Sequence, residues 1–388
     1  MSQARFDDIR PFNDDEYPAV LKRLIDDKEF IRAIARQRFG RIERFAAFAA
    51  HPFIRYSLRP QITHLKSIKV IQGKAKRYIS RMIRHTTDGF TLSGLDALDK
   101  DAPYLFISNH RDIVLDPAFL NYVLYNDQRE TLRIAIGDNL LAKPYVSDLM
   151  RLNKSFIVKR SDKAPRKMLT NFKTLSAYIQ HSLLVDNNPI WIAQAEGRAK
   201  DGNDKTAPAI IKMIAMSKGK EESFTDFINK IKIVPVAISY ELDPNDHAKA
   251  KELYILEKYG KYNKSENEDV DSITKGIKEN KGKVHLALGK PINGKFKNAR
   301  EVAKEVDRQI ITNYKAHPSN HFAFKMLHGN YAPSFTSIKA NYSTVQLEKR
   351  EAAFIERMNA IPEKHRQYAL RMYANIIKNK EEFRSTSA

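Results

Sequence analysis

The sequence predicts an α/β protein, in which a largely parallel mixed sheet is flanked by helices and both ends of the chain form helical extensions. Two observations lead to this prediction. Between about residues 86 and 315, short apolar runs that read as buried strands alternate with amphipathic helical patterns, which is typical of a layered sheet. Outside this range the periodicity is helical only. We therefore expect a basic helical region over 1–85, an α/β domain over 86–315 and a helical extension over 316–388.

The N-terminal region combines helical spacing with a large excess of positive charge. Apolar residues over Tyr17–Phe39 predict one amphipathic helix, and Ile68–Met82 predicts a second, basic one. From Arg41 to Arg84 there are eleven Lys and Arg residues and one acidic residue, Glu43. Aromatic side chains alternate with these cations: Phe45, Phe48, Phe53 and Tyr56. This mixture suits a helix lying in a lipid interface, although a solvated basic face over an ordinary core explains it equally well.

The α/β domain is predicted from apolar runs bounded by turn residues. After a short strand that begins at Phe90, the predicted strands are Tyr104–Ser108, Arg133–Gly137, Ser155–Lys159, Pro189–Ala195, Ile231–Tyr240 and Lys283–Leu288. The predicted helices are one that opens at Asp116-Pro117, then Arg166–Ile179, Pro208–Met216 and Arg300–Tyr314, followed in the extension by Val345–Ile361 and Tyr368–Phe383. The polar stretch Asp243–Lys281 reads as a surface excursion, part helical and part loose.

A histidine and a carboxylate stand at the junction between the first long strand and its helix. The strand ends at Asn109-His110, and Asp116 is a good N-cap for the helix that follows. Ligands of α/β proteins bind at the carboxyl ends of strands, and a histidine oriented by a carboxylate is the minimal general base. The alternative is that His110 is an ordinary loop residue and that Asp116 only caps the helix.

Charged residues follow the later strands as well. They are Arg160 after the third, Glu196-Gly197-Arg198 after the fourth with Lys200 and Lys205 close behind, and Tyr240-Glu241 at the end of the fifth. If these strand ends meet at one edge, the cations suit a phosphate. Glu196, expected on the buried side, would orient the arginines or the substrate, and Gly197 would let a ligand approach the backbone. The alternative is that the arginines and Lys205 are solvated and that Glu196 is a structural ion-pair partner.

The order of these blocks resembles the glycerolipid acyltransferases, the group that contains glycerol-3-phosphate and lysophosphatidate acyltransferases. The matching blocks are SNHRDIVLD, SFIVKR, AEGRAKDG and IVPVAIS, with FTLSGLDAL and HLALGKPI as flanks. They occur in the family's order, and the resemblance extends over roughly Phe90 to Lys315. One block alone would be weak evidence, whereas four in sequence are specific. The resemblance does not include the two ends of the chain.

The resemblance implies an O-acyltransferase in which His110 and Asp116 are catalytic. It implies that the substrate is held by Asn109, Arg160, Glu196, Gly197, Arg198 and Lys205. The donor would be acyl-CoA or an acyl-carrier protein, and no metal or other cofactor is expected. Tyr240-Glu241 and Lys205-Thr206 look more like enzymes that use glycerol 3-phosphate, with lysophosphatidate as the alternative acceptor.

The chain departs from the family pattern in the spacing of the pair. The family has four residues between His and Asp, whereas five separate His110 from Asp116, and Leu115 stands at the usual position. We interpret this as a one-residue bulge. Asp112 is the competing partner for His110, and a scaffold that has lost activity is also compatible with the change.

The charge and the absence of certain residues narrow the remaining function classes. A net charge of +21 implies an anionic partner, which we expect to be a phosphorylated substrate and an anionic membrane surface. A nucleic-acid-binding protein is the alternative, but there is no zinc-ligand spacing and no RNA-binding strand signature, so no nucleic acid is expected. Without cysteine there is no disulfide and no thiol nucleophile. No signal-like segment and no apolar stretch of roughly 20 residues is present, so we expect a peripheral protein on the cytoplasmic face of a membrane.

Overall fold

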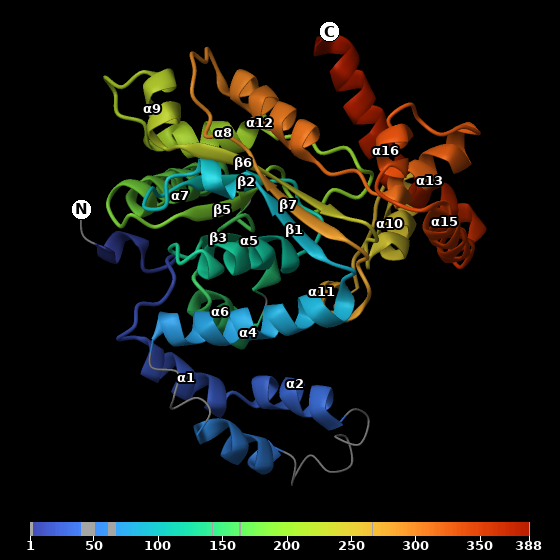
Figure 1. Ribbon diagram of the computed structural model, residues 1–388. Coiled ribbons are helices and arrows are strands. Elements are labelled where there is room, and N and C mark those ends of the chain that lie inside the picture. The colour runs from blue at the N-terminus through green and yellow to red at the C-terminus, as the bar shows by residue number, and fades with distance from the viewer. Residues whose placement is uncertain are drawn as a thin grey trace.

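A mixed sheet lies at the centre of the computed structural model, which describes residues 3–39, 51–60, 67–141, 143–162, 164–265 and 267–387 (Figure 1). Its seven strands have the order β1-β7-β6-β2-β5-β3-β4. They are β1 Phe90–Ser93, β2 Leu105–Ser108, β3 Arg133–Gly137, β4 Ser155–Val158, β5 Ile190–Ala193, β6 Ile233–Tyr240 and β7 Val284–Leu288. Each predicted strand is found within one or two residues of its expected ends, and the α/β fold class is confirmed.

The pairing directions decide which strand ends meet. All neighbouring strands pair in parallel except β6 and β7, which are antiparallel. The carboxyl ends of β2 to β6 therefore lie at one edge of the sheet, while β1 and β7 end at the opposite edge. This arrangement brings together the residues that follow β2, β4 and β5, as expected for an α/β sheet.

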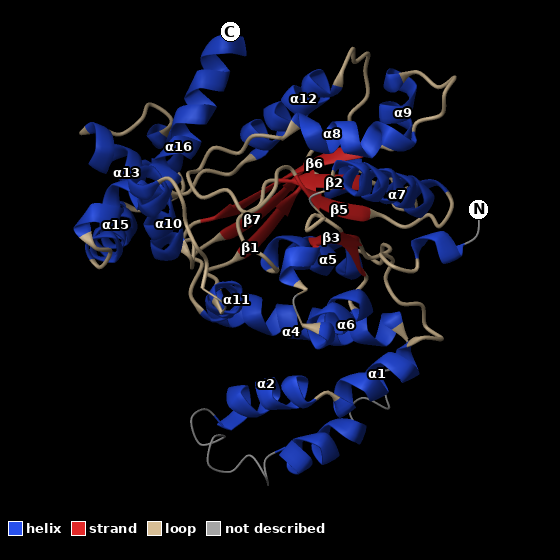
Figure 2. Cartoon of the chain, turned by 180° about the vertical axis from the view of Figure 1, so that it is seen from behind, coloured by secondary structure: helices blue, strands red, loops and turns tan. Residues whose placement is uncertain are grey.

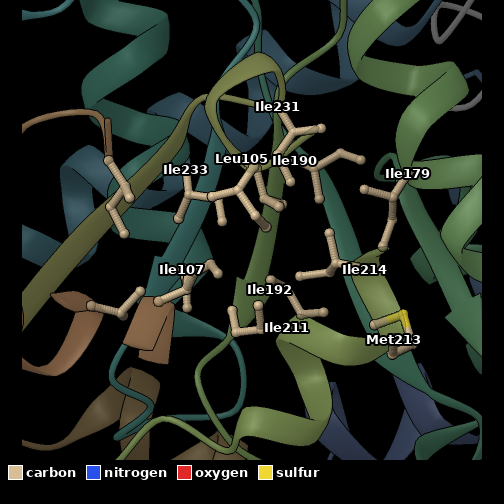
Figure 3. Close-up of a cluster of buried hydrophobic side chains, with 14 of the residues drawn as sticks. Leu105, Ile107, Ile179, Ile190, Ile192, Ile211, Met213, Ile214, Ile231 and Ile233 are labelled. Carbon is tan, nitrogen blue, oxygen red and sulfur yellow. The ribbon is translucent and has the colours of Figure 1, made fainter. Parts of the chain in front are cut away.

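Helices cover both faces of the sheet (Figures 1 and 2). On one face lie α7 Pro165–Leu184, α8 Pro208–Ile214, α9 Phe224–Lys230 and α12 Ala299–Asn313, and on the other lie α4 Ile68–Thr86, α5 Leu115–Asn126, α6 Pro144–Leu152 and α11 Glu268–Lys278. Because helices cover both faces, the alternating side chains of β2 are buried on both sides of the sheet. Leu105 and Ile107 join the core beneath α7 and α8 (Figure 3), whereas Phe106 joins the core beneath α5.

The N-terminal region is helical but is divided differently from the prediction. The single helix expected over Tyr17–Phe39 is two helices, α1 Tyr17–Asp26 and α2 Lys28–Phe39, so that prediction is wrong. The break lies at Asp27, whose backbone leaves the helical conformation and whose carboxylate accepts the Phe30 N–H, as a helix cap does. A short turn η1 Gln3–Phe6 precedes them, and a further helix extends over 51–60. Phe45 and Phe48, which belong to the predicted aromatic pattern, lie outside the described residues.

The C-terminal extension forms a helical cluster at the β7 side of the sheet (Figure 2). Its helices are α13 Pro318–His328, α14 Phe335–Lys339, α15 Thr344–Asn359 and α16 Glu363–Ser387. They share an apolar core with α10 Asp246–Tyr259, in which Ala250 packs with Phe322, Phe354 and Met358. The two helices predicted in the extension are therefore present, with α16 starting five residues earlier than expected.

Candidate active site

His110 and Asp116 lie in contact at the end of β2. The Nδ1 atom of His110 is 2.8 Å from Oδ2 of Asp116, which is fully buried in the first turn of α5. The His110 side chain is 14% exposed and faces a cavity. Because Nδ1 faces the carboxylate, a neutral ring in the tautomer with the Nδ1 proton has Nε2 available as a proton acceptor. The ring also makes an edge contact with Trp191, at 5.5 Å between centroids.

Three further donors hold the Asp116 carboxylate in place. The backbone N–H groups of Arg111 and Asp112 donate to Oδ2 at 2.6 and 3.0 Å, and the Tyr240 hydroxyl donates to Oδ1 at 2.7 Å. Burial and the neighbouring Asp116 raise the pKa of Tyr240 well above its ordinary value, so this hydroxyl stays protonated. Asp116 is thus a fixed acceptor that orients the imidazole and can stabilise its protonated form.

Asp112, the competing partner for His110, instead contacts the backbone at the start of α5. Its Oδ1 accepts the N–H groups of Val114 and Leu115, both at 3.0 Å, at the start of α5. Asp112 therefore makes the capping contacts, and the expectation that Asp116 is the N-cap is wrong, because α5 begins one residue before it. The five-residue spacing is accommodated by this tight turn, which leaves Asp116 beside His110. Burial, followed by the neighbouring Asp116, raises the pKa of Asp112.

Asn109 and Arg111 anchor the loop on either side of His110. The Asn109 amide donates to the Ile238 carbonyl at 2.9 Å and accepts the Ile238 N–H at 2.7 Å, which ties β2 to β6. Arg111 donates to the buried Asp204 at 2.5 Å. Asn109 was predicted to contact substrate, but it is fully buried and does not line the cavity, since neighbouring side chains of an extended chain point to opposite sides.

A cavity of about 630 Å³ opens in front of His110 and is lined by both apolar and charged side chains. The apolar wall includes Ile71 and Ile79 of α4, Tyr122 of α5, Ile136 of β3, Met150 of α6, and Ile273 and Ile277 of α11. The charged part includes Arg160, Glu196, Arg198, Lys200, Lys264 and Asp269. A lining that offers both apolar and cationic side chains suits a ligand with an apolar tail and an anionic group.

The structure brings Arg160, Glu196 and Arg198 to this cavity, as predicted from their positions after β4 and β5. Arg160 lies 3.3 Å from Glu196, so the two side chains form an ion pair at the cavity. The expectation that Glu196 is on the buried side is wrong, because its side chain is 80% exposed. Arg198 is 8% exposed, with Nη2 4.0 Å from Asp269. Within the described residues, Nη1 of Arg198 is buried and has no hydrogen-bond partner.

Of the two other residues predicted to hold the substrate, Gly197 lines the cavity and Lys205 does not. Gly197 lines it and has a φ of +75°, a conformation that favours glycine, and an added Cβ would meet no atom within 4 Å. Lys205 is exposed, does not line the cavity and lies near Asp307. Its position therefore gives no support to a role in holding a phosphate, because the loop between Arg198 and Thr206 carries it away from the strand ends.

Sequence reasoning missed several residues that complete the site. Lys264, Asp269 and the apolar residues of α11 come from the segment that was expected to be a surface excursion. The amphipathic spacing of Val270, Ile273 and Ile277 was the available signal that α11 covers an apolar surface. No group of three or more His, Asp or Glu side chains in the described part of the chain is arranged to hold a metal ion.

The comparison with family models agrees with the resemblance in the motifs. Residues 89–239 match the acyltransferase family model. The chain is also similar to the crystal structure of the 1-acyl-sn-glycerophosphate (LPA) acyltransferase PlsC from Thermotoga maritima, with 16% identity, a TM-score of 0.35, and coverage of 64% of this chain and 79% of that one. No curated protein matches the sequence. The matched segment contains His110, Asp116, Arg160 and Arg198, so this part of the chain is an acyltransferase domain.

Proposed function

We propose that this acyltransferase moves a fatty acyl group from an acyl thioester to the hydroxyl of glycerol 3-phosphate. The observation that carries the proposal is the His110–Asp116 pair, whose imidazole faces a cavity lined by the apolar wall and also by Arg160, Arg198, Lys200 and Lys264, which together are called the cationic mouth. An acyl chain and a phosphate are the two groups that such a cavity accommodates together.

In the proposed reaction His110 is the general base. Its Nε2 takes the proton of the acceptor hydroxyl as the oxygen attacks the thioester carbonyl carbon. The tetrahedral intermediate then collapses, the C–S bond breaks, and the leaving thiolate takes the proton back from the imidazolium. Asp116, which accepts from Nδ1 at 2.8 Å, stabilises the imidazolium in between. The sequence of steps needs no covalent acyl-enzyme and uses no metal or redox cofactor.

The acceptor's phosphate is assigned to the cationic mouth. Arg198 supports this assignment most strongly, because it is a nearly buried guanidinium with an unused N–H group. Arg160 lies at the same mouth and is held by Glu196 at 3.3 Å. A phosphate bound there fixes the distance between the acceptor hydroxyl and His110, which converts part of the binding energy into correct orientation.

The acyl chain is assigned to the apolar wall between α4, α5 and α11, and the thioester to the mouth near His110. Both acyl-CoA and acyl-carrier protein fit this assignment, since each delivers the same thioester. We further propose that the protein works at an anionic membrane surface. In α4, Val70 and Tyr78 are 41% and 53% exposed beside the exposed cations Lys69 and Arg77. No helix in the described ranges is both long and apolar enough to cross a bilayer.

The test is an assay of the purified chain with each donor and each acceptor. With palmitoyl-CoA or palmitoyl-carrier protein, glycerol 3-phosphate should release one thiol for every monoacylated product, and His110→Ala should abolish the release. Faster turnover with lysophosphatidate would transfer the assignment to the alternative acceptor. An absence of turnover with both acceptors, or full activity in the His110→Ala variant, would refute the proposal.

A further inference from the structure

The carboxylate of Asp269 lines the cavity beside two of its cations, Arg198 and Lys264. Asp269 is the second residue of α11 and lies 2.8 Å from Lys264 and 4.0 Å from Arg198. Both cations line the cavity. One carboxylate of the protein thus serves as the counter-ion of two cavity cations.

Two other cations at the cavity, Lys200 and Arg160, are paired more closely with carboxylates of their own. Lys200 lies 2.8 Å from Glu252, and Arg160 lies 3.3 Å from Glu196. Arg198 differs because its ion pair is the longest of these contacts, and because Nη1 remains buried without a hydrogen-bond partner among the described residues. A buried N–H group without a partner is costly, so this guanidinium favours the arrival of a further anion.

Asp269 is placed where it can yield to such an anion. Its side chain is 26% exposed, and that of Lys264 is 43% exposed, so water can replace the contacts that are lost. The segment that carries it lies after residue 239, beyond the part of the chain that matches the family model. The contact is therefore contributed by the insertion that follows β6 and not by the matched domain.

We propose that Asp269 is a built-in competitor for the acceptor's phosphate, so that acceptor binding exchanges one anion for another. The inference rests on the proposed function, because it assumes that Arg198 and Lys264 receive a phosphate. A dianionic phosphate makes stronger contacts to two cations than a single carboxylate does, so it displaces Asp269. Because every anion must displace Asp269, the affinity for all anions is lowered. A dianion overcomes this competition better than a monoanion, so the site prefers the more highly charged ligand.

Inorganic phosphate is the probe that tests this exchange without any catalytic step. Titration calorimetry on the full chain should show that Asp269→Asn binds phosphate about tenfold more tightly than the wild type, since a nearby negative charge is removed. The same variant should have a lower KM for glycerol 3-phosphate than the wild type, because the acceptor's phosphate meets less competition. Arg198→Gln should lose phosphate binding.

Asp271→Asn is the matched control, since Asp271 is exposed, lies two residues further along α11 and undergoes the same charge change. It should alter phosphate affinity by less than twofold. If Asp269→Asn binds phosphate no more tightly than the wild type while Arg198→Gln loses binding, the competitor role is wrong and the phosphate site stands. If no variant binds phosphate, the phosphate acceptor itself is refuted, and the competitor role with it.

Discussion

Asp116 combines two effects on His110 that a substitution can separate. Its Oδ2 accepts from the ring and from two backbone N–H groups, while Oδ1 accepts from Tyr240. An asparagine at this position would keep its carbonyl oxygen toward the three N–H donors and turn its amide toward Tyr240, whose hydroxyl can also accept. The orientation and tautomer of His110 would then survive, and only the negative charge would be lost.

Asp116→Asn is accordingly expected to lower kcat roughly 10- to 100-fold, because the imidazolium loses its counter-charge. Asp116→Ala removes orientation as well and should lower kcat by roughly 10³- to 10⁴-fold. Steady-state kinetics with saturating donor and acceptor measure both values.

The control for these variants is Asp112→Asn, which removes the same charge four residues earlier. Asparagine retains the acceptor that caps α5, so kcat should stay near the wild-type value. An Asp112→Asn variant as inactive as Asp116→Ala would contradict the assignment of the pair.

At the scale of elements, α10 braces the loop that carries His110. Lys249 of α10 is almost fully buried, and its ammonium donates to the Arg111 carbonyl at 2.7 Å and to Asp243 at 2.5 Å. The next residues in the network belong to the C-terminal extension, where Arg357 and Tyr373 both donate to Asp246. The extension is thereby connected to the loop through hydrogen bonds between buried groups.

Lys249→Met should therefore destabilise the protein by about 3–5 kcal/mol, because Asp243 is left buried without its cation. The double variant Asp243→Asn/Lys249→Met should recover much of this loss, since neither partner then carries an unpaired charge. Urea unfolding measures the free energies, and Lys251→Met, an exposed position on α10, is the matched control. Equal stability of the single and double variants would show that the pair is not coupled.

The elements illustrate what a local pattern can predict. The central strands β2 and β6 were found because their residues are buried on both sides and form apolar runs. The meeting of His110, Arg160 and Arg198 followed from the parallel direction of those strands. The inward role of α11 and the outward path of Lys205 were missed, because they depend on where long connections run in space, which local spacing does not specify.

The residue that precedes α13 is a buried histidine, His317, that couples stability to pH. The His317 side chain accepts a backbone N–H at the start of α13, and its Nε2 lies 3.1 Å from the Ser239 hydroxyl. Burial, followed by the nearby Lys315, lowers the pKa of His317 to about 3. The unfolded chain, with a histidine pKa near 6.5, therefore binds a proton that the folded chain rejects between about pH 3 and 6.5.

The contribution of neutral His317 to the free energy of unfolding is thus fully present above pH 6.5. It decreases as the pH falls toward 3, by up to about 1.4 kcal/mol per pH unit. His317→Asn retains a capping side chain that does not titrate. Its free energy of unfolding should fall less steeply between pH 6.5 and 4 than that of the wild type, as urea titrations at several pH values would measure. Parallel curves for the two proteins would contradict the assignment, because the other buried histidines, His285 and His321, whose pKa values are each lowered to about 4, are present in both.

At the scale of the whole molecule, the basic helix α4 and the cavity lie on the same side of the sheet. Helices α1, α2 and α4 lie together below the sheet, opposite α9 and α12 (Figure 1). Helix α4 supplies Ile71 and Ile79 to the apolar wall and also presents Lys69 and Arg77 to solvent. A membrane that attracts α4 would therefore lie next to the apolar wall of the cavity, where an acyl chain enters or leaves without crossing water.

This arrangement predicts binding to anionic vesicles through α4. Each basic residue near such a surface contributes about 1 kcal/mol, so Lys69→Glu/Arg77→Glu should weaken binding to phosphatidylglycerol vesicles at least tenfold in a sedimentation assay. Raising the salt concentration to 0.5 M should release the wild type, because the attraction is screened within a few ångströms. The control is Lys295→Glu/Lys297→Glu, which makes the same charge change at exposed positions between β7 and α12 and should leave binding within about twofold of the wild type. Equal losses in the two variants would mean that net charge, and not the α4 surface, governs the attraction.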